Sequence, residues 1–149
     1  MVTPLKKSIW VDAPVETVFP YFVEAEKMIQ WSGIEARLEP TPGGIFELNM
    51  GEAGLIQGRF VRVDSPAFLS YEIDAPEGMD GPKSLVEISL QVQAGGTLVE
   101  ILQTGLPDPF PIIAGRGWEH HLARLSVAAN GGTPGPDSLC TKPMQSLID

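Results

Sequence analysis

Residues 84–104, SLVEISLQVQAGGTLVEILQT, decide the fold of this chain. Apolar residues occupy alternate positions on both sides of the glycine pair Gly95-Gly96. Alternate residues of a β-strand point to the same face, so the pattern predicts two strands with one buried face, joined by a tight turn. The residues predicted to face inward are Val86, Ile88, Leu90, Val92, Val99, Ile101 and Gln103.

Similar short stretches recur upstream, separated by turn-forming residues. Such regular spacing predicts a curved antiparallel sheet with one buried face. Gly58, inside one of these stretches, predicts a bulge or a tight bend. The predicted strands are residues 5–12, 34–40, 45–50, 56–63 and 68–73. Their inward-facing residues are expected to be Phe46, Leu48, Met50, Phe60, Leu69 and Tyr71.

Two short helices are predicted after the first strand. Asp12 can cap the first helix, Pro14 suits its first turn, and Glu16 favours the positive N-terminal end. Pro20 lacks a backbone donor, so the helix is expected to kink or end there. The second short helix is predicted at residues 24–31.

The C-terminal third holds one long predicted helix. Residues 105–114, GLPDPFPIIA, contain three prolines and are not expected to form a regular helix. The helix is predicted over residues 115–130, ended by the following glycine pair. We therefore divide the chain into one domain, residues 1–132, and a Pro- and Ser-rich tail, residues 133–149. The tail is expected to be extended unless its apolar residues dock: Leu139, Met144, Leu147 and Ile148.

The composition is that of a globular protein with one domain. The 149 residues are 43% hydrophobic and 19% charged, and a chain of this length can bury a substantial core. No apolar run reaches the length of about 18 residues that a transmembrane helix needs, and the start lacks the apolar run of a secretory signal. The single cysteine, Cys140, cannot form an internal disulfide. That fits a reducing compartment, and we expect a cytoplasmic location.

The charge balance limits the partners. Ten Lys and Arg residues stand against nineteen Asp and Glu residues, which gives a formal net charge of −9. Phosphate backbones repel such a surface, and the densest basic run is only Lys6-Lys7. We therefore expect no nucleic-acid partner and no membrane insertion. A homodimer is left open.

Five segments share the features of one known group. They are an alanine-proline helix start leading to a tryptophan, a glycine-pair hairpin, a glycine strand with a proline turn, a glycine-threonine strand, and a glycine-tryptophan entry to the last helix. In order, these segments are VDAPVETVFPYFVEAEKMIQW (11–31), PGGIFELNM (42–50), GRFVRVDSPAFLSYEI (58–73), GGTLVEILQTGL (95–106) and GWEHHLARL (117–125). With the order of elements, they resemble the START-like (SRPBCC) superfamily, and within it proteins similar to the C-terminal domain of the activator of heat-shock protein 90 ATPase.

The resemblance implies an α+β helix-grip fold, in which the sheet wraps around the C-terminal helix and leaves a cavity. Members use that cavity for lipids, sterols, polyketides and other apolar molecules, as enzymes such as cyclases or as binders only. We expect binding of a small apolar or amphipathic ligand. One alternative is a cyclase-type enzyme, with His121 as general acid/base and Tyr71 or Gln103 orienting the substrate. The other is a co-chaperone-like module that binds a protein through its acidic surface.

The ligand site is expected on the inward rows and the last helix. Gln103 is the polar member of its row, so it should bond to a ligand, a water or His121. Trp31 can gate the cavity mouth or simply pack. Glu87 and Glu100 alternate onto the outer face and are not expected to form an acid/base pair. The expected ligand-binding residues are Trp31, Phe46, Met50, Phe60, Tyr71, Ile88, Ile101, Gln103, Trp118, His121, Leu122 and Leu125.

The histidine pair His120 and His121 invites a metal or catalytic interpretation. Adjacent positions of a helix point apart, and chelating pairs need a spacing of three or four residues. We therefore expect no joint metal site, a solvated His120, and His121 at the edge of the apolar stripe. The sequence holds no zinc-type spacing, phosphate-binding glycine loop or dinucleotide fingerprint. No metal, cofactor or catalytic residue is predicted. The apolar stripe is Trp118, Leu122, Leu125 and Ala129.

Overall fold

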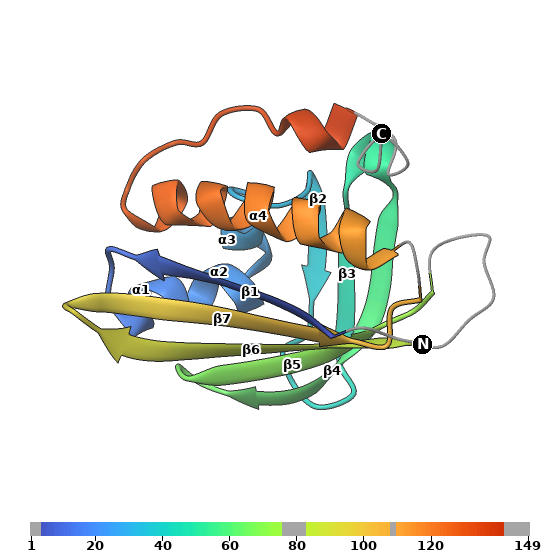
Figure 1. Cartoon of the computed structure of the whole chain (residues 1–149), viewed down its shortest axis with the longest axis horizontal. Coiled ribbons are helices and arrows are strands. Elements are labelled where there is room, and N and C mark those ends of the chain that lie inside the picture. The colour runs from blue at the N-terminus through green and yellow to red at the C-terminus, as the bar shows by residue number, and fades with distance from the viewer. Residues whose placement is uncertain (1–3, 76–82, 108–109, 142–149) are drawn as a thin grey trace.

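The computed structural model describes residues 4–75, 83–107 and 110–141 of the chain. These residues form a seven-stranded sheet, three short helices and one long helix that lies over the sheet (Figure 1). The predicted helix-grip fold is confirmed. The strands are β1 (Leu5–Val11), β2 (Glu35–Leu38), β3 (Ile45–Asn49), β4 (Leu55–Asp64), β5 (Phe68–Ile73), β6 (Ser84–Gln93) and β7 (Gly96–Thr104). The helices are α1 (Val15–Val18), α2 (Pro20–Val23), α3 (Ala25–Met28) and α4 (Phe110–Ala129), with 3₁₀ turns η1 (Gly51–Ala53) and η2 (Ser138–Thr141).

The sheet is antiparallel throughout, in the order β1-β7-β6-β5-β4-β3-β2. Only β1 pairs out of sequence order, with β7. Figure 1 shows β2, β3 and β4 rising beside α4, while β5, β6 and β7 lie below it. The sheet therefore curls around the helix, as the resemblance implied.

The register of β6 and β7 aligns their inward rows. Val86 pairs with Gln103 and Ile88 with Ile101, and all four side chains are at most 5% exposed. Val92 is the exception to the predicted row, because it lies near the strand end and is 76% exposed. The other residues predicted to face inward are all buried: Phe46, Leu48, Met50, Phe60, Leu69, Tyr71, Leu90 and Val99.

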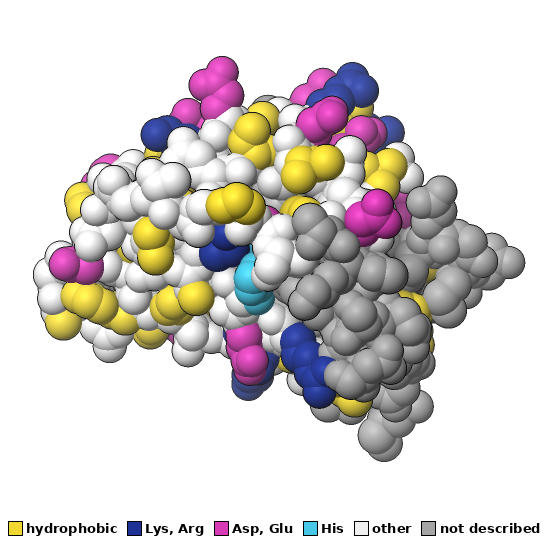
Figure 2. Space-filling view, turned by 90° about the horizontal axis from the view of Figure 1, so that it is seen from above, with side chains coloured by type: hydrophobic (Ala, Val, Ile, Leu, Met, Phe, Trp, Pro, Cys, Tyr) yellow, Lys and Arg dark blue, Asp and Glu magenta, His cyan; other side chains and the backbone are white. Residues whose placement is uncertain are grey.

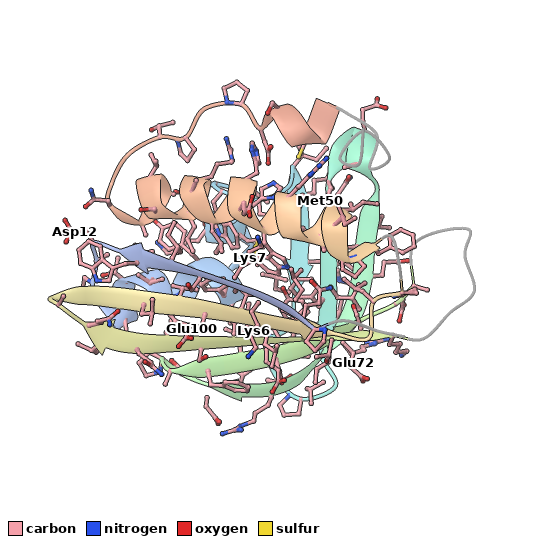
Figure 3. The ribbon with its side chains drawn as sticks, viewed as in Figure 1. Lys6, Lys7, Asp12, Met50, Glu72 and Glu100 are labelled. Atoms are coloured by element: carbon pink, nitrogen blue, oxygen red, sulfur yellow. The ribbon has the colours of Figure 1, made fainter. Side chains whose placement is uncertain are left out.

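The edge strand β1 is tied directly to α4. Figure 3 shows Lys7 between the strand and the helix, whereas Lys6 lies on the other face. Lys7 forms an ion pair with Glu119 of α4, and this hydrogen bond and the lysine charge lower the pKa of the Glu119 carboxyl.

The short helices break where proline predicts. α1 ends at Val18 and α2 begins at Pro20, where the missing N–H costs nothing because first-turn donors have no partner inside the helix. The prediction that Asp12 caps the first helix is wrong. Pro14 occupies the N-cap position, and no side chain bonds to the first turn.

The long helix begins earlier than predicted. α4 starts by Phe110, so the expected start at Gly115 and the exclusion of 105–114 from the helix are wrong in part. Pro111 falls in the first turn, where proline is tolerated. The Pro107 carbonyl accepts the Phe110 N–H, at 2.9 Å, before the helix begins. Pro107, before the helix, and Pro111, in its first turn, therefore do not interrupt it.

Gly58 is required by strand proximity. A Cβ at this position would lie 1.8 Å from the Glu72 carbonyl oxygen of β5. The register shift in β4 falls two residues later, between Phe60 and Arg62. The bulge predicted at Gly58 is therefore displaced, and the glycine serves a close backbone approach.

The surface above α4 carries mixed side chains. Figure 2 shows hydrophobic, acidic and basic groups interleaved there, with the basic groups scattered. Over residues 4–75, 83–107 and 110–141, no helix has both the length and the apolar character needed to cross a bilayer.

Residues 133–141, here called the strap, return over α4 and end in η2 (Figure 1). Met144, Leu147, Ile148 and the side chain of Leu139, which were expected to decide whether the tail docks, lie outside the described residues. The division into residues 1–132 and 133–149 remains a prediction.

Candidate functional site

An aromatic cluster occupies the inner face of the curled sheet. Phe46 of β3 stacks on Tyr71 of β5, with ring centroids 3.9 Å apart. Phe60 of β4 meets both rings edge-on, at 5.6 and 6.1 Å. Each side chain is at most 4% exposed. Three of the predicted ligand-site residues thus lie together, because alternation in three neighbouring strands turns them to the same face.

The Tyr71 hydroxyl is the unusual group of this cluster. No residue of the described ranges hydrogen-bonds to it. Among those residues, every sealed side-chain nitrogen or oxygen atom has a partner, so the Tyr71 oxygen must border space that a water molecule can enter. Burial raises the pKa of this phenol, since the charged phenolate is disfavoured away from water. The hydroxyl therefore stays protonated and can donate or accept a hydrogen bond.

A second polar group joins the sheet to α4. Trp118 Nε1 donates to Gln103 Oε1 at 2.9 Å, and Gln103 Nε2 donates to Ser84 Oγ at 3.2 Å. Gln103 and Ser84 are 5% and 3% exposed. Gln103 was expected to bond to a ligand, a water or His121, and the His121 alternative is wrong, because Trp118 and Ser84 are its partners.

The remaining predicted residues separate into two groups. Ile88, Ile101, Leu122 and Leu125 are at most 2% exposed and belong to β6, β7 and α4. Trp31 is instead held in the layer of short helices.

Trp31 is packed among the short helices, and its role at a cavity mouth remains a prediction. It is 2% exposed, donates from Nε1 to the Tyr21 carbonyl at 3.0 Å and meets Phe22 edge-on. Met50 lies beside Ser32, whose hydroxyl donates to its sulfur at 3.9 Å. Neither residue joins the aromatic cluster through a direct ring contact or hydrogen bond among the described residues.

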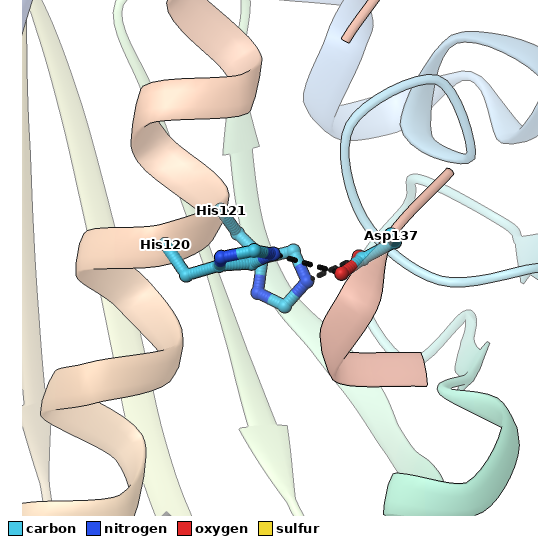
Figure 4. Close-up of side chains that lie close together, drawn as sticks. All are labelled: His120, His121 and Asp137. Carbon is cyan, nitrogen blue, oxygen red and sulfur yellow. Dashed lines mark hydrogen bonds and ion pairs between the residues drawn. The ribbon is translucent and has the colours of Figure 1, made fainter. Parts of the chain in front are cut away.

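The histidine pair converges on a residue of the strap. His120 Nε2 lies 2.8 Å from Asp137 Oδ1, and His121 Nε2 lies 2.7 Å from Asp137 Oδ2 (Figure 4). The side chains of His120, His121 and Asp137 are 29%, 7% and 5% exposed. The prediction of a solvated His120 is therefore wrong. Adjacent helix positions were expected to point their side chains apart. Here both rings turn toward the same carboxylate, which lies between them.

The residues predicted for the enzyme alternative, His121, Tyr71 and Gln103, do not come together in one site. His121 Nδ1 lies 2.9 Å from the Gly117 carbonyl and Nε2 faces Asp137. Neither ring nitrogen is therefore directed at Tyr71 or Gln103. A coupled acid/base set is not present on these three residues.

Arg124 and Cys140 also lie beside Asp137. Arg124 Nε lies 3.7 Å from Asp137 Oδ2 and donates to the Trp31 carbonyl at 3.1 Å. Burial, and then the charge and hydrogen bond of Asp137, raise the pKa of the Cys140 thiol to about 11. The guanidinium also reaches strap carbonyls, those of Pro134, Gly135 and Pro136.

Sequence reasoning missed this cluster. Asp137 sits in the Pro- and Gly-rich stretch TPGPD, which resembles a loop, and its separation from the histidines hides the contact. The sequence offered one indication. Two histidines lie near the apolar stripe of a helix, and histidines need hydrogen-bond partners when another part of the chain buries them. The contact of Gln103 with Ser84 was also not predicted. Ser84 lies at the start of β6, where the alternation of apolar residues does not yet identify the inward face.

The outer face of the sheet has an open groove of approximately 510 Å³. Glu87 and Glu100 point to it, which matches their predicted outward orientation. Apart from Lys7 and Ile101, the residues that line the groove alternate with the inward rows and lie on the opposite face. Its lining residues are Lys6, Lys7, Ser8, Phe68, Glu87, Ser89, Glu100, Ile101 and Leu102.

Comparison with known proteins gives a consistent family. The family model described as Activator of Hsp90 ATPase homolog 1-like protein matches residues 12–130, most of the chain. An AHSA1-like protein from Rhizobium etli is 35% identical; the match covers 93% of this chain and 88% of that one, with a TM-score of 0.71. No curated protein matches the chain in sequence.

Two further solved structures show the fold alone. DynU16, from the dynemicin biosynthetic locus, is 20% identical with a TM-score of 0.77, and the match covers 88% of this chain and 48% of that one. The chain thus spans about half the length of DynU16. The Aha1 dimer from Colwellia psychrerythraea is 12% identical with a TM-score of 0.77, covering 87% of this chain and 98% of that one.

Proposed function

The chain belongs to the Activator of Hsp90 ATPase homolog 1-like family, and from this premise we propose that it binds a small apolar or amphipathic molecule between its sheet and α4. The family and the helix-grip fold fit a ligand-binding role, but fold alone does not assign one. The proposal therefore depends on a specific feature of the interior.

That feature is the Tyr71 hydroxyl: the side chain is 4% exposed, its oxygen borders space that water can enter, and no described residue hydrogen-bonds to it. A ligand with a polar atom at this point would take the place of water as the hydrogen-bond partner of the hydroxyl. The rings of Phe46 and Phe60 and the aliphatic rows of β6 and β7 supply an apolar environment. The expected ligand is therefore largely apolar, with a hydroxyl, carbonyl or carboxyl group that meets Tyr71.

Two tyrosines provide a matched test. Tyr21 Oη donates to the Ala128 carbonyl at 3.1 Å, whereas Tyr71 has no such partner. In wild type we expect saturable binding of an amphipathic fluorescent probe that carries a carboxylate. Tyr71→Phe should weaken it by roughly 2- to 12-fold, the equivalent of one hydrogen bond of 0.5–1.5 kcal/mol. Tyr21→Phe should leave probe affinity unchanged and lower stability instead.

Native mass spectrometry of the purified chain would report a co-purified small molecule directly. Absence of both a retained molecule and probe binding would contradict the proposal, and so would equal probe affinities for the two tyrosine variants. In that outcome a protein-interaction module becomes the better hypothesis.

The same spectrum tests assembly. The relative from Colwellia psychrerythraea is a dimer, and a homodimer of this chain would appear at twice the monomer mass. The cytoplasmic location, argued from the single Cys140, likewise remains a prediction.

A further inference from the structure

We propose that His120, His121 and Asp137 form a binding site for one divalent transition-metal ion of the zinc class, which fastens the strap to α4. This site is distinct from the proposed ligand site. It lies where the strap meets α4, whereas the ligand site lies on the inner face of the sheet.

The three side chains already converge. Their candidate ligand atoms, one from each residue, all lie within 4.8 Å of one another. Two ligand atoms on a tetrahedral zinc ion with bonds of 2.0–2.1 Å lie roughly 3.3 Å apart. The contacts of 2.8 and 2.7 Å go to different oxygens of Asp137, so rotations of the side chains would have to bring both imidazole nitrogens and one carboxylate oxygen to the ion.

The orientation of His121 favours a metal ligand. Its Nδ1 lies 2.9 Å from the Gly117 carbonyl oxygen, which accepts hydrogen bonds only, so Nδ1 carries a hydrogen and donates it. A metal-binding histidine typically donates its other ring N–H to a carbonyl or carboxylate in this way. Nε2 then faces Asp137, and either a proton or a metal ion satisfies that contact.

Burial is graded across the site. His121 and Asp137 are held at 7% and 5% exposure, and His120 at 29%. Figure 2 shows a histidine side chain at the molecular surface on this face, and His120 is the more exposed of the two histidines. Three protein ligands with one open side would leave a position for water.

The donor set selects the class of metal. Two imidazoles and one carboxylate suit zinc and its neighbours, whereas magnesium and calcium require oxygen ligands. Arg124 does not compete as a ligand. Its guanidinium lies 3.7 Å from Asp137 but donates to backbone carbonyls of Trp31 and the strap, which makes it a positioning residue for the carboxylate.

Cobalt provides a visible readout of such a site. The full chain, without a polyhistidine tag and stripped with a chelator, would be titrated with CoCl₂ while d–d absorption is followed. We expect saturation at one equivalent and loss of the signal when ZnCl₂ displaces cobalt. His120→Ala, His121→Ala and Asp137→Asn should each weaken affinity by at least about tenfold, the lower bound for losing even an outer-shell partner.

The control is Asp64→Asn, which removes the same charge from an exposed carboxylate paired with Arg62. It should bind cobalt as wild type does. Because His120 is half-buried, His120→Ala is the variant least able to disturb folding, and circular dichroism would verify the fold of each variant. The proposal is overturned if wild type shows no saturable binding of Co²⁺ or Zn²⁺, or if folded His120→Ala binds as tightly as wild type.

Discussion

At the scale of single residues, the hydrogen bond from Trp118 to Gln103 joins α4 to the inner face of β7. Trp118→Phe keeps most of the ring but leaves Gln103 Oε1 unpaired at a position that is 5% exposed. An unsatisfied buried acceptor costs about 1–3 kcal/mol, so we expect the free energy of unfolding to fall by that amount. Urea denaturation would measure it.

Trp10 offers the matched control for this change. Its Nε1 donates to the Gln93 carbonyl at 2.8 Å, but the residue is 42% exposed. Water can replace the lost donor there, so Trp10→Phe should cost less than Trp118→Phe. Equal losses would mean that burial does not govern the Gln103 contact.

The pKa of the single cysteine, Cys140, depends in part on Asp137. The pKa of the Cys140 thiol is raised from 9.0 to about 11, first by burial and then by Asp137. The folded state thus holds this proton more tightly than the unfolded chain does. The associated stability is complete below pH 9 and is lost as the pH rises through about 11.

Iodoacetamide should therefore alkylate native Cys140 much more slowly than unfolded Cys140 at pH 9, because only the thiolate reacts. Asp137→Asn removes a charge that raises the pKa, so its alkylation should be faster at the same pH. The prediction fails if native and urea-unfolded chains show the same dependence of rate on pH.

At the scale of elements, Asp137 and the Arg124 guanidinium both hold the strap to α4, and only Asp137 contacts the two histidines among the described residues. Asp137→Ala would leave His121 and Arg124 without their shared acceptor. Breaking a buried charge pair by removing one partner costs about 3 kcal/mol at the lower end. We expect a loss of that size in urea denaturation, with faster hydrogen exchange in the strap.

The comparison variant is Asp64→Ala, which breaks the exposed pair with Arg62. Exposed pairs contribute about 0–1 kcal/mol, so this variant should melt close to wild type. A similar result for Asp137→Ala would show that the strap adds nothing to the stability of residues 1–132.

Elements with a local signal could be predicted from the sequence. Alternation gave the inward rows of β6 and β7, and Pro20 predicted the break between α1 and α2. The start of α4 could not be predicted by counting prolines, because proline is unfavourable inside a helix but suits its first turn. The sequence pattern does not show which case applies.

At the scale of the whole molecule, the site residues also divide into those with a local sequence pattern and those without one. Phe46, Phe60 and Tyr71 were predicted to face inward, and strand pairing brings them together. The contacts of Asp137 with the histidines were not predicted, because they depend on the path of the strap over α4. A loop path is set by tertiary packing and leaves no periodic signal.

The helix α4 thus has two different environments. Trp118 contacts the inner face of the sheet, and His120 and His121 contact the strap. Ligand in the interior and metal at the strap would each bind the folded state only, so each would raise the midpoint of unfolding. The two effects can be separated, since a chelator removes only the second.

Ile101→Trp tests whether the interior has room for a ligand. Ile101 lies in the middle of β7 opposite Ile88, is 2% exposed, and belongs to the row that ends at Gln103. If this row lines a ligand space, the larger ring enters it at little cost and blocks binding. We therefore expect nearly unchanged thermal unfolding together with loss of apolar-probe binding. In a solid core, overpacking would instead cost roughly 1–3 kcal/mol. A midpoint lowered by several degrees, in a protein whose wild type binds no probe, would mean that the interior is filled by side chains alone.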